Sequence, residues 1–86
     1  MGARLMAPIT LQRFFAELDK LKQDTETGTL QPEDYDGRLA RVIRELRERG
    51  LDSDRAAATA ALADAVMRGV ISPPVEAHIR NRLGLV

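Results

Sequence analysis

The chain has 86 residues, of which 30% are charged, and its 13 basic side chains are balanced by 13 acidic ones. This length suffices for one small domain, and zero net charge gives no overall attraction toward nucleic acid or an anionic membrane. The absence of cysteine excludes disulfides, thiolate nucleophiles and sulfur metal sites. No apolar run approaches the roughly 20 residues that cross a bilayer. These features predict a cytoplasmic protein with no membrane segment.

Apolar residues at helical spacing first appear just after Thr10. Residues 1–8 have no such spacing, so we predict a mobile tail there and a single helical domain over residues 9–86. Thr10 can cap a helix that runs to about Asp24. One face of this helix collects its apolar residues, Leu11, Phe14, Phe15, Leu18 and Leu21. The polar connection that follows is short, so we expect the next helix to fold back antiparallel on this one.

The best-marked helix follows the segment Gly28-Thr29-Leu30-Gln31-Pro32. Pro32 suits the first position of a helix, and the acidic residues after it complement the positive end of the helix dipole. Its apolar stripe consists of Tyr35, Leu39, Val42, Ile43 and Leu46. Gly50 is expected to end it with a left-handed cap. Gly37, inside the helix, weakens it by roughly 1 kcal/mol relative to alanine, so we expect this glycine to permit a close helix contact.

The other face of this second helix is rich in arginine, with Arg38, Arg41, Arg44, Arg47 and Arg49. Opposite charges lie four residues apart in four pairs, Asp34–Arg38, Arg41–Glu45, Arg44–Glu48 and Glu45–Arg49. Such pairs stabilise a helix by roughly 0.2–0.5 kcal/mol each. We therefore interpret the arginine stripe as a salt-bridged, solvated face and not as a phosphate-binding surface.

Two shorter helices are predicted in the second half of the chain. The first is rich in alanine and runs from Arg55 to Arg68, with Asp52 or Ser53 as its cap. Ser72 can cap the second, over residues 73–83, which two prolines open. Gly69 separates the two.

Four helices joined by short connections imply an all-α fold, with two antiparallel helical hairpins that form a small bundle. The hairpins are expected at residues 9–50 and 51–86. The expected core collects Phe14, Phe15, Leu18, Leu21, Tyr35, Leu39, Val42, Ile43, Leu46, Leu62, Val66 and Ile79.

The connections inside the two hairpins are alike. Gly28-Thr29-Leu30-Gln31-Pro32 and Gly69-Val70-Ile71-Ser72-Pro73 share the order Gly, any residue, Leu or Ile, a polar residue and Pro. Internal duplication and convergence on the same turn residues both explain this likeness. With their flanking helices, the two segments resemble tandem copies of the SHOCT family of short helical hairpins, often found at the C-terminus of bacterial proteins. The resemblance implies an interaction or oligomerisation module without catalysis.

No residues stand at the spacing of a catalytic or metal site. His78 is the only histidine and has no second ligand one turn away. Both serines, Ser53 and Ser72, lie where helix capping explains them. The acidic residues at the start of the second helix are explained by its dipole. We therefore predict no enzymatic activity, no cofactor and no bound metal.

Residues 65–79 have the look of a helix-turn-helix. In that alternative the helix over residues 73–83 belongs to a nucleic-acid-binding regulator, with Arg80, Asn81 and Arg82 as its contacts. Two prolines open the would-be recognition helix, however, and charged residues occupy positions that are usually apolar. An ordinary helical hairpin is the favoured interpretation.

Apolar residues gather late in the chain, beside the alanine-rich helix; they are Val70, Ile71, Leu83, Leu85 and Val86. They exceed what a four-helix core of this size needs, and a bare apolar patch would promote aggregation. We expect them to form a contact surface, which a symmetric dimer would cover. The sequence thus predicts a small protein-protein interaction or oligomerisation module that binds another protein or itself, a homodimer being favoured.

Overall fold

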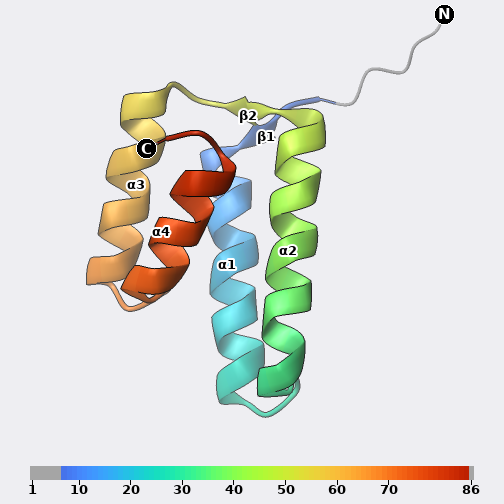
Figure 1. Cartoon of the computed structure of the whole chain (residues 1–86). Coiled ribbons are helices and arrows are strands. Elements are labelled where there is room, and N and C mark those ends of the chain that lie inside the picture. The colour runs from blue at the N-terminus through green and yellow to red at the C-terminus, as the bar shows by residue number, and fades with distance from the viewer. Residues whose placement is uncertain (1–6, 86) are drawn as a thin grey trace, which may run out of the picture.

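The computed structural model describes residues 7–85 and places four helices and two very short strands in them (Figure 1). The elements in chain order are β1 (Ile9–Thr10), α1 (Leu11–Glu26), α2 (Pro32–Arg49), β2 (Leu51–Asp52), α3 (Arg55–Met67) and α4 (Pro73–Arg82). Helices hold 72% of the described residues, which confirms the predicted four-helix, mostly helical class. Residues 1–6 of the predicted tail lie outside the described residues.

Helices α1, α2 and α4 begin where the sequence predicts, α1 and α4 with a side-chain cap and α2 with a proline. The Thr10 hydroxyl accepts a hydrogen bond from the Arg13 amide at 3.1 Å. The Ser72 hydroxyl accepts one from the Val75 amide at 3.4 Å. Pro32 is the first residue of α2. These bonds satisfy amides that have no partner inside the helix.

The two strands were not predicted, and they join the segment before α1 to the linker after α2. They pair in parallel, with Ile9 opposite Leu51. The Ile9 amide donates to the carbonyl of Gly50 at 2.8 Å, and the Arg49 guanidinium donates to the carbonyl of Ala7 at 2.9 Å. The start of the described chain is thus tied to the end of α2.

This pairing also changes the cap of α3. Asp52 belongs to β2, so neither it nor Ser53 caps the helix, and that prediction was wrong. The carboxylate of Asp54 accepts from the Ala57 amide instead, at 2.7 Å.

One hydrophobic core joins all four helices. It contains Ile9, Phe14, Leu18, Leu21, Leu30, Leu39, Ile43, Leu46, Leu62, Ala65, Ile71 and Ile79. Eight of the twelve predicted core residues are among them. The other four, Phe15, Tyr35, Val42 and Val66, are partly buried at its margin.

The two similar connections have the same structural role. Gly28 and Gly69 both adopt positive φ, of 82° and 77°. Two residues later, Leu30 and Ile71 are 6% and 4% exposed and enter the core. Each connection therefore joins two helices through a glycine with positive φ and anchors itself in the core with one apolar side chain.

The helices pack mainly as α1 on α2 and α3 on α4, and α1 also contacts α3 (Figure 1). Within residues 7–85 no helix has both the length and the apolar character that a membrane crossing requires.

Candidate interaction groove

Three cavities of about 410, 370 and 580 Å³ lie along α4. The first two lie between α4 and α2, and the third is bordered mainly by α1, α3 and the connection before α4. The first and second share His78, and the second and third share Val75. Neighbouring cavities therefore border a common side chain. We call this row of three cavities the α2–α4 groove and describe it from its basic end to its apolar end.

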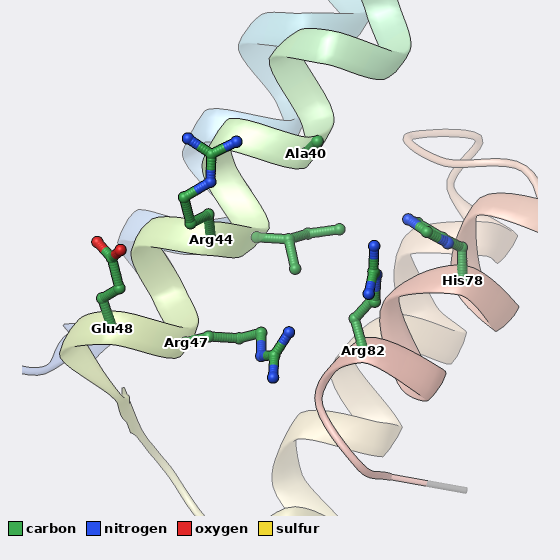
Figure 2. A pocket seen from close by; sticks show the side chains of 7 residues that line it. Ala40, Arg44, Arg47, Glu48, His78 and Arg82 are labelled. Carbon is green, nitrogen blue, oxygen red and sulfur yellow. The ribbon is translucent and has the colours of Figure 1, made fainter.

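The basic end is lined by Ala40, Ile43, Arg44, Arg47 and Glu48 of α2 and by His78 and Arg82 of α4. Figure 2 shows the side chains of Arg47 and Arg82 reaching from the two helices into the space between them. Three guanidinium groups thus border one cavity that holds a single carboxylate.

The ion pairs of α2 differ from those that the sequence predicts. Arg49 pairs with Glu45 at 3.3 Å, as expected. Arg38, however, pairs with Asp24 of α1 at 3.8 Å. Residues of α1 thus compete for the charges of α2, which a pattern along a single helix does not reveal.

In the described part of the chain, Arg41 and Arg44 lack their predicted partners, and Arg47 of α2 and Arg82 of α4 are unpaired as well. Among residues 7–85, no carboxylate lies within 4.0 Å of a nitrogen of Arg41, Arg44, Arg47 or Arg82. The prediction of a fully salt-bridged face is wrong in three of its four pairs. Unpaired guanidinium groups that border a hollow attract anions, and carboxylates above all, because the planar fork of donors matches two carboxylate oxygens.

Further along, the groove becomes apolar. Leu39, Pro74 and Val75 line its middle, with Asp36 at the side. Tyr35 and Val75 also line the third cavity, together with the connection over residues 69–73. Val66 of α3 and Lys22, Thr25 and Glu26 of α1 complete its lining. Partial burial raises the pKa of the Tyr35 phenol, and the nearby charge of Asp36 raises it further.

The residues predicted to form a C-terminal contact are mostly used inside the chain. Ile71 is a core residue, and Leu83 and Leu85 pack against the core. The Leu85 amide also donates to the carbonyl of Arg80 at 2.8 Å, which closes α4. Val70 lines the apolar end of the groove, and Val86 lies outside the described residues. The apolar excess that motivated a C-terminal contact is therefore largely absorbed by the core.

The three residues of the nucleic-acid alternative do not share one surface. Arg80 pairs with Glu76 at 4.0 Å, and its Nε is buried without a hydrogen-bond partner. Asn81 is exposed, and Arg82 borders the groove. Of the three residues, only Arg82 lies beside other arginines that are unpaired in the described chain, Arg44 and Arg47.

Metal-binding chemistry has no candidate in the part of the chain that the structure describes. No three side chains of His, Cys, Asp or Glu are grouped there as metal ligands would be. His78 lies at the junction of the first two cavities of the groove.

Comparisons of the chain with models of known protein families, with curated proteins and with solved structures give no match. The likeness to SHOCT hairpins therefore rests on the two Gly-to-Pro connections and their flanking helices alone, and the role of the groove has to be argued from its own residues.

Proposed function

We propose that the chain is a non-catalytic interaction module that binds a polypeptide segment in the α2–α4 groove. The observation that carries this proposal is the order of chemistry along the groove, with unpaired guanidinium groups at one end and apolar side chains further on. A segment with carboxylates at one end and an apolar side chain beyond them would satisfy both. Buried apolar contacts supply affinity in such interfaces, and charged groups supply orientation.

The proposal includes the arrangement of the helices as two antiparallel hairpins, α1 with α2 and α3 with α4. The groove then follows the line along which one hairpin faces the other. Sites between packed units are common places for ligands and partners. A cytoplasmic location remains part of the proposal.

A protein segment is favoured over nucleic acid by the acidic side chains in the groove, Asp36 and Glu48. Their carboxylates would repel the negatively charged phosphates of a nucleic acid. The alternative predicts duplex DNA binding that weakens steeply with salt, and that Arg80→Ala with Arg82→Ala weakens this binding and flattens its salt dependence. Such a result would replace the present proposal.

Photo-crosslinking tests where the partner binds. A photoreactive amino acid is placed at Ala40 or His78, which line the groove, and at the exposed Ala60 of α3 as a control. We expect a discrete crosslinked protein, either a second copy or another chain, from the groove positions only.

Binding of that protein, once purified, tests the chemistry. Arg47→Ala with Arg82→Ala should weaken it by about tenfold or more, since two guanidinium groups lose their carboxylate partners. Arg55→Ala is the matched control, because Arg55 is exposed, unpaired among the described residues and absent from the groove lining. Equal affinity of both variants would contradict the proposal.

A further inference from the structure

One face of α2 carries a stripe of exposed residues that lies outside the hydrophobic core. It consists of Glu33, Gly37, Ala40, Arg44 and Arg47, which are all exposed. Their spacing is four, three, four and three residues, the repeat along which two helices pack in a coiled coil. Acid stands at one end of the stripe, small residues in the middle and arginine at the other end.

The charges of this stripe are free to meet a second molecule. Among residues 7–85, neither Glu33 nor Asp36, which borders the stripe, lies within ion-pair distance of a basic side chain. Arg44 and Arg47 are likewise unpaired. The ion pairs within the chain thus leave acids at one end of the helix face and bases at the other.

Gly37 is unexplained by the single chain. A β-carbon added there would meet no atom within 4 Å, so the close helix contact expected from the sequence does not occur within the chain. A glycine inside a helix is destabilising relative to alanine. A glycine at this position is explained if a helix of a second molecule packs closely against α2 here.

We propose that two copies of the chain associate through this stripe as an antiparallel homodimer with its two-fold axis at Ala40. Ala40 lies midway along the sequence between Asp36 and Arg44, and also between Glu33 and Arg47. Antiparallel pairing therefore sets Asp36 against the partner's Arg44 and Glu33 against the partner's Arg47. The inference rests on the proposed function and names the partner at the basic end of the groove, which Ala40, Arg44 and Arg47 line, as α2 of a second copy.

Symmetry doubles each of these contacts, because in a two-fold dimer every pair occurs twice. Glu33 and Arg47 lie about 21 Å apart along the helix, so the charges frame the contact at both ends. Gly37 and Ala40 let the two helices approach closely between them. A parallel pairing would set acid against acid and arginine against arginine, so charge selects the antiparallel orientation.

Reversal of polarity tests the pairing by sedimentation across a dilution series. Arg44→Glu with Arg47→Glu makes the whole stripe acidic and should raise the dimer dissociation constant by about a hundredfold. Glu33→Arg with Asp36→Arg makes it basic and should do the same. An equimolar mixture should form a heterodimer, and the chain with all four substitutions should dimerise again. Asp52→Arg with Arg55→Glu, outside the stripe, should leave the dissociation constant unchanged.

Gly37→Leu separates assembly from folding. The larger side chain improves helix propensity but blocks the close approach, so dissociation should increase by about tenfold or more while resistance to urea does not fall. A wild type that stays monomeric at every concentration, or a four-substitution chain that fails to dimerise although it folds, would overturn the inference. If groove positions then still crosslink to a different protein, the proposed function stands; if they do not, both fail.

Discussion

Gly50 ends α2 with φ 87° and ψ 153°. The sequence predicts a left-handed cap, and the sign of φ is right, but ψ is extended because the chain runs directly into β2. Residues with a β-carbon rarely adopt this conformation, and strain of this kind amounts to about 1–3 kcal/mol. Gly50→Ala should therefore lower the free energy of unfolding by about that amount in urea titrations.

Gly37→Ala is the matched control for this change. Gly37 lies inside α2 with a negative φ, and an added methyl group meets no other atom. Alanine there should raise the free energy of unfolding by up to about 1 kcal/mol, measured where the chain is monomeric. If Gly50→Ala stabilised the chain as Gly37→Ala should, Gly50 would not have a positive φ.

Tyr35 offers a second test at the scale of a residue, because it is the only tyrosine and the chain has no tryptophan. Burial, and secondarily the charge of Asp36, raises the pKa of its phenol above the ordinary value for tyrosine. The ultraviolet absorbance of tyrosinate should therefore appear at higher pH in the folded chain than in the urea-unfolded chain.

The raised pKa also fixes the direction of a pH effect. The stability linked to Tyr35 is fully present below the unfolded pKa and is lost as pH rises through the folded pKa. Asp36→Asn should leave most of the shift in place, because burial is its larger cause. Equal midpoints in the folded and unfolded chains would show that the phenol is not buried.

At the scale of elements, the short β1–β2 pairing is a structural tie. Ile9 is 4% exposed and lies in the core, so Ile9→Ala should lower the free energy of unfolding by about 2–5 kcal/mol, as Leu39→Ala and Leu46→Ala should. Met67→Ala is the control, because Met67 is 86% exposed and should change it by at most about 0.5 kcal/mol. Equal stability of the Ile9 and Met67 variants would place Ile9 outside the core.

The sequence predicts the helices well because each carries a strong local signal. Thr10 and Ser72 mark helix starts as caps, and Pro32 marks one as a first helical residue. The apolar period of α1 and α2 identifies most of the core. A two-residue strand has no period, so β1 and β2 could not be found. Leu30 and Ile71 were missed because residues in connections are usually exposed.

The groove could not be predicted because it depends on the distance between α2 and α4. The ion pair of Arg38 with Asp24 likewise depends on which helix lies alongside α2. One signal was nevertheless present in the sequence. The stripe from Glu33 through Ala40 to Arg47 has heptad spacing and ordered charge, but the i,i+4 pairs along the same helix offered a simpler explanation.

At the scale of the whole molecule, the net charge is zero, but the charged residues are unevenly distributed over the surface. The exposed charges that no partner neutralises among residues 7–85 include acids at the start of α2 and arginines near its end. Such a surface complements a rotated copy of itself. Association through it should weaken as salt rises, because the Debye length falls to about 10 Å at 0.1 M.

The most direct measurement of this central claim is a dilution series followed by NMR spectra of the backbone amides. We expect concentration-dependent shifts at Glu33, Gly37, Ala40, Arg44 and Arg47, with His78 and Arg82 across the groove also affected. Amides of the exposed face of α3 near Ala60 should stay constant, and added salt should reverse the changes. Shifts centred on α3, or spectra that do not change with concentration, would contradict the account.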